Sequence, residues 1–264
     1  MDIDVLVKNQ KYRHLMTLQK IVAAALISVA ATPIMAQELV GSVEGAVSTF
    51  TDSDVDRTVT SLSGGGEIGV GSAFALGGNL AFSDASDDDT SVFNVTAHGM
   101  YLVSPSAAVG IFVGADSGDD LDVMTYGIEY GSTFATSQFG AYFGAVESDD
   151  LDGDEDVTIF GLNAEFAVTP AISVGVDYNA FSISAGSDVD VTFNDASLLA
   201  RYTFSEGTSV FAQIGQISTS GNIEGETFAG SEEAEYISIG AAYKIGRNGG
   251  GNIFGERSFL GFGG

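Results

Sequence analysis

The stretch "VTIFGLNAEFAVTPAISVGVDYNAF", residues 157–181, alternates apolar and other side chains on both sides of one short interruption. Before the interruption, which is Thr169-Pro170, apolar residues occupy every second position from Phe160 to Val168. After it, the same alternation resumes. Because successive side chains of a strand point to opposite faces, this period of two predicts two β-strands joined by a tight turn. The question is which surroundings the apolar face of each strand meets.

The same alternation recurs along the chain and predicts twelve strands. These segments cover roughly residues 39–50, 57–70, 73–83, 91–103, 107–116, 123–132, 137–146, 157–168, 171–184, 191–204, 208–217 and 235–245. Each has about the length that a tilted transmembrane strand needs, ~9–11 residues. We find no stretch with the period of an amphipathic helix of useful length, so the sequence predicts an all-β fold.

The connections between these segments alternate between two kinds. Every second connection has two to five residues, and Glu206 is the only acidic residue among them. The other connections hold 25 of the 34 acidic residues that follow residue 36; they are 51–57, 83–90, 116–122, 147–156, 185–190 and the longest, 218–235. Successive turns of an up-and-down sheet lie at opposite ends. One end is therefore expected to be short and nearly uncharged, and the other to form an acidic crown made of these six connections.

A soluble β-sandwich does not require this segregation of its turns. An outer-membrane barrel, by contrast, has short periplasmic turns, longer external loops and an even number of strands. Closing the sheet also removes the strand edges whose polar groups lipid cannot satisfy. The sequence therefore predicts an antiparallel up-and-down transmembrane β-barrel of about twelve strands in a bacterial outer membrane.

The first 36 residues are expected to be an N-terminal extension and signal peptide that is removed. Four basic side chains precede the apolar run at 21–32, and the small residue Ala36 follows at the expected cleavage position. The apolar run is too short to span a bilayer as a helix, which needs about 20 residues. We accordingly divide the chain into a signal segment (1–36), a barrel (37–246) and a Gly-rich C-terminal tail (247–264).

The charge balance excludes one class of partner. After residue 36 the chain has 34 acidic and five basic side chains, a net charge of −29. Proteins that bind nucleic acid present a basic face, so no nucleic-acid partner is expected. The chain has no cysteine, so hydrogen bonding and burial must hold the fold together without disulfides.

The inward face of the predicted strands is mostly small and polar. Its charged and larger polar members are the expected pore-lining residues Glu44, Glu67, Asn79, Asn94, His98, Glu129, Gln138, Asn163, Glu165, Asp177, Asp195, Arg201 and Lys244. Side chains can fill an eight-stranded barrel, whereas sixteen to eighteen strands leave an aqueous channel. Twelve strands with this lining predict a hydrated lumen, and its excess of acids would favour cations. The alternative is that these polar residues are merely tolerated in a wet interior.

The last predicted strand, "SIGAAYKI" (238–245), resembles the assembly signal of bacterial outer-membrane β-barrel proteins, which are porin-like in architecture. Ser238, Gly240, Tyr243 and Ile245 occupy the polar, Gly, aromatic and hydrophobic places of that pattern. The resemblance implies insertion by the barrel assembly machinery into a membrane of lipid and lipopolysaccharide. Members of this group usually end at that strand, whereas this chain continues through 247–264. The tail could be a periplasmic extension or could fold into the lumen.

No catalytic or metal site is expected. The acid-rich connection 147–156 lacks the Gly and Glu spacing of the helical calcium loop, so its aspartates are only weak candidates for divalent ions: Asp149, Asp150, Asp152, Asp154 and Asp156. His98 is the only histidine after residue 36, and no nucleophile and base set surrounds it in sequence. We therefore expect no enzyme activity and no cofactor.

Two functions remain from these observations. The first is a passive porin-like channel for small solutes, with a preference for cations. The second is a barrel that conducts little and acts as a structural or surface-interaction protein through its acidic, divalent-binding crown. The sequence leaves the oligomeric state open.

Overall fold

The computed structural model describes residues 39–51, 57–86, 91–118, 122–148, 155–185, 189–205, 207–223, 226–246, 253–255 and 257–258. The expected signal segment, 1–36, lies outside these ranges, as do four of the five candidate divalent ligands, Asp149, Asp150, Asp152 and Asp154. Among the described residues, no helix is long and apolar enough to cross a membrane.

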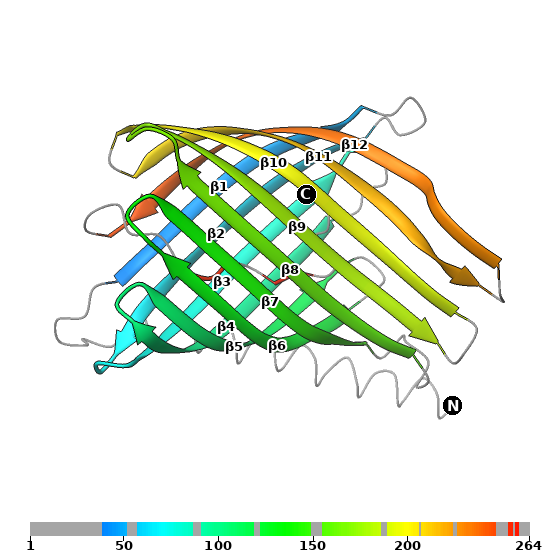
Figure 1. The fold of residues 1–264 in the computed structure, drawn as a ribbon, viewed down its shortest axis with the longest axis horizontal. Coiled ribbons are helices and arrows are strands. Elements are labelled where there is room, and N and C mark those ends of the chain that lie inside the picture. The colour runs from blue at the N-terminus through cyan, green and yellow to red at the C-terminus, as the bar shows by residue number, and fades with distance from the viewer. Residues whose placement is uncertain are drawn as a thin grey trace, which may run out of the picture. The chain divides into compact units, whose positions relative to one another are not determined.

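Twelve antiparallel strands form one closed barrel, as the alternation predicted (Figure 1). They are β1 (Leu39–Phe50), β2 (Thr58–Val70), β3 (Phe74–Ala85), β4 (Ser91–Ser104), β5 (Ala107–Ser117), β6 (Asp122–Thr133), β7 (Ser137–Ser148), β8 (Glu155–Ala167), β9 (Ile172–Ala185), β10 (Val189–Ser205), β11 (Thr208–Ile223) and β12 (Glu226–Ile245). Each strand pairs with its neighbours in sequence, and β1 pairs with β12 to close the barrel. The up-and-down topology is therefore confirmed.

The closing seam between β1 and β12 is a full ladder. It runs through ten consecutive residue pairs, from Gly41 opposite Ile245 to Phe50 opposite Tyr236. Closure matters because an unpaired backbone N–H or C=O in hydrocarbon costs several kcal/mol. A continuous seam removes both sheet edges along the part of the wall that lipid would cover.

The turn in the quoted stretch shows how compact the connections at the uncharged end are. The Oγ1 atom of Thr169 accepts hydrogen bonds from the backbone N–H groups of Ala171 (3.2 Å) and Ile172 (3.0 Å). Two other short connections at this end place a glycine at positive φ, Gly71 at 73° and Gly207 at 85°, where other residues are disfavoured. These three turns need no further length to reverse the chain.

The outside of the barrel is an apolar belt, so the apolar face of each strand meets lipid. Large hydrophobic side chains remain exposed in mid-strand, among them Ile111 (66%), Ile128 (63%) and Ile239 (66%). At the uncharged end, aromatic side chains pair across neighbouring strands: Phe74 with Tyr101, and Phe139 with Phe166. Aromatic rings at this level are typical of the girdles that mark a membrane interface.

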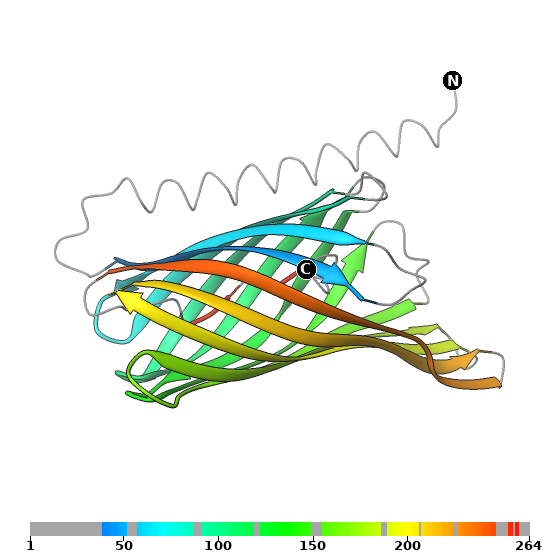
Figure 2. The same cartoon turned by 90° about the horizontal axis from the view of Figure 1, so that it is seen from above.

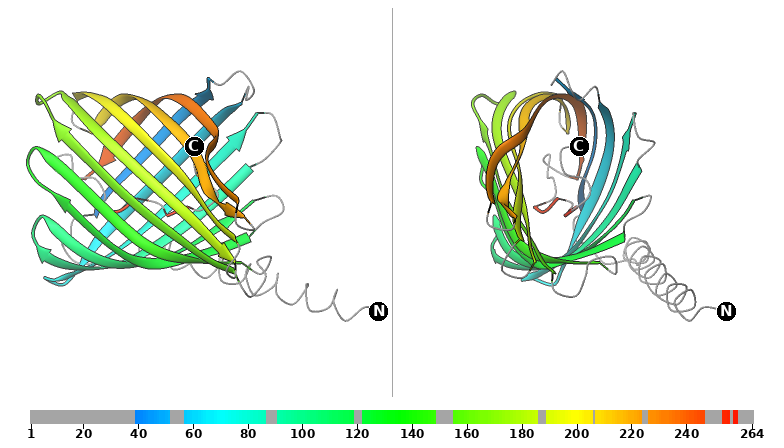
Figure 3. Two further views of the ribbon diagram at one scale, coloured as in Figure 1. Left: turned by 45° about the vertical axis from the view of Figure 1, so that its right-hand side comes forward. Right: turned by 90° about the vertical axis from the view of Figure 1, so that its right-hand side faces the viewer.

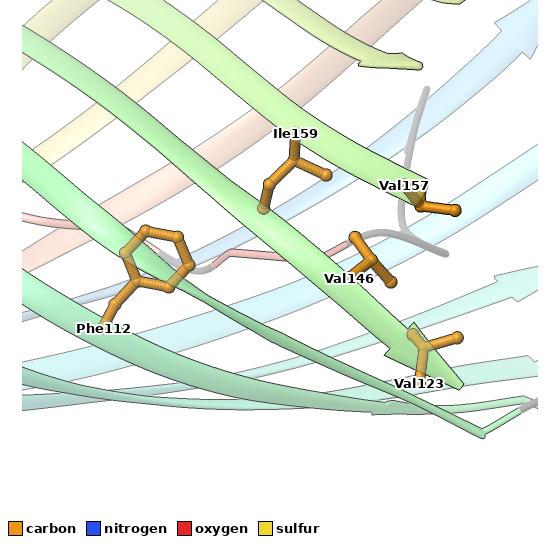
Figure 4. Close-up of a cluster of buried hydrophobic side chains, with 5 residues drawn as sticks. All are labelled: Phe112, Val123, Val146, Val157 and Ile159. Carbon is orange, nitrogen blue, oxygen red and sulfur yellow. The ribbon is translucent and has the colours of Figure 1, made fainter. Parts of the chain in front are cut away.

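The interior differs at the crown end from the small and polar lumen that the sequence predicts. Two apolar clusters lie there: Phe112, Val123, Val146, Val157 and Ile159 form one, which is drawn in Figure 4, and Phe50, Val59, Ala85 and Tyr236 form the other. The expectation of a polar lining throughout was therefore wrong for this end. The physical reason is that Val123, Val146, Val157 and Ile159 point inward on neighbouring strands and pack against one another, while polar residues such as Ser48 line another part of the same end.

The expected loop at 218–235 was also wrong. β11 continues to Ile223 and β12 begins at Glu226, so this segment is a long hairpin that projects past the other strands (Figure 2). A register shift between Ser218 and Ser220 marks the change from barrel to hairpin. In this segment β11 still pairs with β10 up to Ile223, whereas the part of β12 before Tyr236 has no partner on β1 and pairs with β11 alone.

A charge placed on the apolar belt tests the assignment of the faces. Ile128→Lys puts an ammonium group at the middle of β6 on the lipid side, so the free energy of unfolding in vesicles should fall by about 2–4 kcal/mol. Urea unfolding followed by the heat-modifiable gel band measures this. Gln138→Lys, which faces the lumen, is the matched control and should leave stability nearly unchanged. Equal effects at the two positions would contradict the assignment.

Candidate functional site: a lumen shared by the tail and a polar passage

Part of the C-terminal tail lies inside the barrel. Its described residues, 253–255 and 257–258, run within the ring of strands in two views (Figure 1, Figure 3). Phe254 is 1% exposed and Arg257 is 5% exposed, although both belong to a Gly-rich terminal segment. Of the two positions that the sequence allowed for the tail, these residues take the lumen.

Phe254 is held by groups from β2, β3 and β4. The Oε1 atom of Glu67 accepts hydrogen bonds from the backbone N–H groups of Ile253 (2.5 Å) and Phe254 (2.9 Å). The Phe254 ring stacks on the imidazole of His98 with the centroids 5.8 Å apart, and it packs against the buried Met100. The carboxylate of Glu67 thus binds the main chain of the tail.

Arg257 lies between a carboxylate and two aromatic rings. Its Nη2 atom donates to Glu129 Oε2 at 3.0 Å, and both side chains are almost completely buried. Its guanidinium carbon lies 4.4 Å from the centroid of the Tyr142 ring and 5.9 Å from that of Phe112. A planar guanidinium binds a carboxylate and stacks on aromatic faces at the same time, which a lysine ammonium does less well.

His98 continues this network from the other side of Glu129. Asn79 Nδ2 donates to His98 Nε2 at 2.8 Å, which leaves the Nδ1–H group of the imidazole to donate to Glu129 Oε1 at 2.7 Å. Glu129 therefore accepts hydrogen bonds from both His98 and Arg257. Both imidazole nitrogens are thereby bound, one by an amide and the other by a carboxylate.

The backbone of Arg257 is also recognised. Its N–H donates to Thr96 Oγ1 at 3.0 Å. Its carbonyl oxygen accepts from Asn94 Nδ2 at 3.1 Å and from Thr125 Oγ1 at 3.3 Å. Asn94 also donates to Asp116 at 2.5 Å, so the groups that hold Arg257 are themselves fixed from β5.

Two glycines of the wall make room for the tail. A Cβ atom at Gly131 would lie 2.4 Å from Ile253 Cγ2 and 2.9 Å from Phe254 Cε1. A Cβ atom at Gly114 would lie 3.0 Å from the Arg257 carbonyl oxygen and 2.4 Å from Thr125 Oγ1. Any larger residue at these two positions would push against the tail.

A polar passage remains beside the tail. It consists of two adjoining cavities of about 310 and 340 Å³. The two cavities share the lining residues Glu44, Ser63, Asn163, Asp177, Gln213 and Gly255. One extends toward the uncharged end, where Gln138 and Lys244 line it, and the other extends toward the crown end, where Ser48 and Tyr236 line it. Together they follow the interior along the barrel axis.

The two cavities are lined by four carboxylates and three basic side chains, and only some of the carboxylates have a basic partner in an ion pair. Arg201 forms ion pairs with Glu44 at 3.3 Å and with Glu165 at 3.5 Å. Asp177 instead accepts from Asn179 Nδ2, and Asp195 accepts from the Tyr236 hydroxyl at 3.0 Å. Asp177 lies on β9 opposite Ser197, two residues along β10 from Asp195. Such diagonal neighbours on one face are about 7–8 Å apart, so two carboxylates lie together in the passage wall.

The expected pore-lining residues thus fall into three groups: those that line the passage, those that line it and also bind the tail, and those that contact the tail alone. Glu44, Gln138, Asn163, Glu165, Asp177, Asp195, Arg201 and Lys244 line the passage. Asn79 and Asn94 also reach it but bind the tail as well. The carboxylates of Glu67 and Glu129 bind the tail, and His98 lies beneath Phe254. Their expected role as free lining is therefore corrected, because the tail takes their hydrogen bonds.

The other candidate residues are found where their positions in the strands predict. Ser238 is buried in the lumen, whereas Tyr243 and Ile245 are exposed on the outside of β12. Asp156 is exposed at the crown end of β8. Within the described ranges, no group of three or more acidic, His or Cys side chains could hold a metal ion.

The tail-binding residues could not be recognised from the sequence. Thr96, Thr125 and Tyr142 lie on predicted inward faces, but nothing local marks them as partners of a segment more than a hundred residues away. The available signal was in the tail itself, where Ile253, Phe254 and Arg257 follow a run of glycines. These side chains can bind an apolar or an acidic surface.

Comparison with known proteins shows the fold. No protein-family model matches the chain, and no curated protein matches it. Among solved structures, the NanC porin has a TM-score of 0.58 at 9% identity, covering 77% of this chain and 100% of its own. An outer membrane channel from Pseudomonas putida has a TM-score of 0.52 at 13% identity, covering 80% and 97%. The KdgM porin has a TM-score of 0.50 at 9% identity, covering 76% and 98%.

These likenesses lie far below the identity at which function transfers, so they establish architecture. The chain has the closed barrel of outer-membrane porins, and the predicted resemblance to that group is confirmed at this level. The comparisons establish the barrel, and the role of the tail residues inside it follows from the contacts that these residues make.

The buried ion pair between Arg257 and Glu129 predicts a clear stability pattern. Glu129→Gln leaves the Arg257 guanidinium buried without its carboxylate, and the free energy of unfolding should fall by about 3 kcal/mol. The double variant Glu129→Gln/Arg257→Met removes both charges and should recover most of that loss. Urea unfolding in vesicles provides the measurement. Glu147→Gln is the control, because the Glu147 side chain is exposed on the outside of the barrel, where it accepts a hydrogen bond from the Tyr126 hydroxyl. A double variant no more stable than the single one would refute the pairing.

Proposed function

We propose that this protein is a passive porin-like channel of a bacterial outer membrane that passes small hydrophilic solutes and prefers cations. The observation that carries the proposal is the polar passage beside the tail, which follows the barrel interior along its axis. A barrel whose only task was structural would not need two adjoining polar cavities along its axis. Insertion through the assembly machinery, guided by Ser238, Gly240, Tyr243 and Ile245, is part of the same proposal.

The cation preference follows from the charges on the passage wall. Glu44 and Glu165 share Arg201, and Lys244 lies near Glu44, so these four groups carry no net charge together. Asp177 and Asp195 have amide and phenol partners instead, and in a low-dielectric wall their field reaches further than it would in water. Acidic rings favour cations in pores by this mechanism. The pair therefore acts as the selectivity element of the passage.

The width of the passage limits the solutes. The tail and its seat fill one side of the lumen, and the two apolar clusters narrow the crown end. The KdgM porin has also been solved with oligogalacturonate, an anionic oligomer. The excess of acids in this lumen supports small cations and neutral solutes here and argues against a ligand of that kind.

A second candidate is the barrel that conducts little and acts at the cell surface through its acidic crown and bound divalent ions. The observation that favours it is the tail inside the lumen, which reduces the open cross-section. Catalysis receives no comparable support, because the two nitrogens of His98 are bound by Asn79 and Glu129. Conductance separates the first two functions directly.

Substitution of the aspartate pair tests the channel. In a planar bilayer under a salt gradient, residues 37–264 should show discrete steps and a reversal potential directed toward cations. Asp177→Asn/Asp195→Asn should lower the cation-to-anion permeability ratio several-fold. Glu147→Gln removes a carboxylate on the outside of the wall and should change nothing. Silence from folded, inserted protein would favour the surface-interaction barrel, and an unchanged ratio in the double variant would refute the assigned role of the pair.

A further inference from the structure

We infer that the inner wall of β2–β7 carries a peptide-binding seat for an arginine-bearing segment, and that the chain's own tail occupies it as a tethered plug that sets the width of the passage. The inference rests on the proposed channel function. The seat consists of Glu67, Asn79, Asn94, Thr96, His98, Gly114, Thr125, Glu129, Gly131 and Tyr142.

The first argument is the specificity of the contacts with the Arg257 side chain. A guanidinium between Glu129 and the rings of Tyr142 and Phe112 satisfies charge, planarity and stacking together. A buried arginine without such partners would be strongly unfavourable. The pocket therefore selects a guanidinium over a neutral side chain, and its geometry favours Arg over Lys.

The second argument is that the seat recognises main chain as well as side chain. Glu67 accepts two consecutive backbone N–H groups, and Thr96 accepts a third at Arg257. Asn79 and Asn94 donate to the carbonyl oxygens of Phe254 and Arg257. Collapse of a Gly-rich segment onto a polar wall would not pair both the N–H and the C=O groups of Phe254 and Arg257 with specific side chains.

The third argument is the shape of the wall. The space that Gly114 and Gly131 leave is taken by the Arg257 carbonyl, Ile253 and Phe254. On the opposite side, Ile253 and Phe254 line one cavity of the passage, Arg257 and Ser258 line the other, and Gly255 lines both. The same residues thus fill the seat and form one wall of the passage. Release of the tail must widen the passage.

A designed disulfide tests the seat independently of conductance. The native chain has no cysteine, so Gly131→Cys/Ile253→Cys introduces the only two thiols. A Cβ atom at 131 would lie 2.4 Å from Ile253 Cγ2, and Ile253→Cys removes that atom, so the two sulfur atoms take its place and oxidation of the inserted protein should form the bond in most molecules. Mass spectrometry of the linked peptides measures it. The matched control, Ile128→Cys/Ile253→Cys, places the first thiol on the lipid side of the same strand and should not link. Equal linking in both variants, or none in either, would overturn the seat.

Conductance then tests the plug. Residues 37–246, without the tail, should conduct several-fold more than 37–264, and a synthetic peptide of residues 247–264 should reduce the current of the truncated channel. The same peptide with Arg257→Ala should block much more weakly, and the one with Arg257→Lys should be intermediate. The oxidised disulfide variant should keep the low conductance.

The outcomes separate the plug from the channel. If 37–264 conducts and truncation leaves its conductance unchanged, the plug is refuted and the channel stands. If both forms are folded and silent, the channel function fails, and the plug fails with it, whether or not the disulfide forms. A block by the Arg257→Ala peptide as strong as that by the native peptide would refute the guanidinium seat.

Discussion

The need to pair every backbone polar group inside lipid governs this structure. A β-sheet satisfies that requirement only when it closes, and the ten-residue seam between β1 and β12 closes it. Closure with twelve strands then fixes the rest. The outer face of each strand has to be apolar, the turns have to lie at two ends, and the interior has to be either filled or wet.

The interior of this barrel is filled on one side and open on the other. On one side, the tail provides Phe254 for an apolar cluster and Arg257 for a buried carboxylate. On the other side, Glu44, Asp177 and Asp195 line a polar cavity rather than facing hydrocarbon. Glu67 and Glu129 are thus bound by the tail, Asp116 is bound by Asn94, and the other lumen carboxylates lie along the passage; each arrangement avoids the cost of an isolated buried charge.

The faces, the strand number and the topology could be predicted from the sequence because lipid enforces strict alternation, and a slip by one residue would turn acids such as Glu129 into the membrane. The hairpin at 218–235 could not be predicted in this way. The part of β12 that forms it has no partner on β1, so the alternation that lipid enforces elsewhere is absent there. The apolar cluster around Phe112 and Ile159 was open to the same alternation but was overlooked in favour of the polar positions. The tail seat depends on contacts such as Glu129–Arg257, 128 residues apart, which no local pattern encodes.

The central claim is that the barrel has a lipid face and a wet, acidic interior face on alternate residues. Single cysteines placed in turn along 210–216 of β11 in inserted protein, treated with membrane-impermeant thiol reagents of each charge sign, test it most directly. The account predicts labelling at lumen positions such as Gln213, faster with the cationic reagent, and protection at lipid positions such as Ile214. Reversed alternation, uniform protection, or faster labelling by the anionic reagent would contradict it.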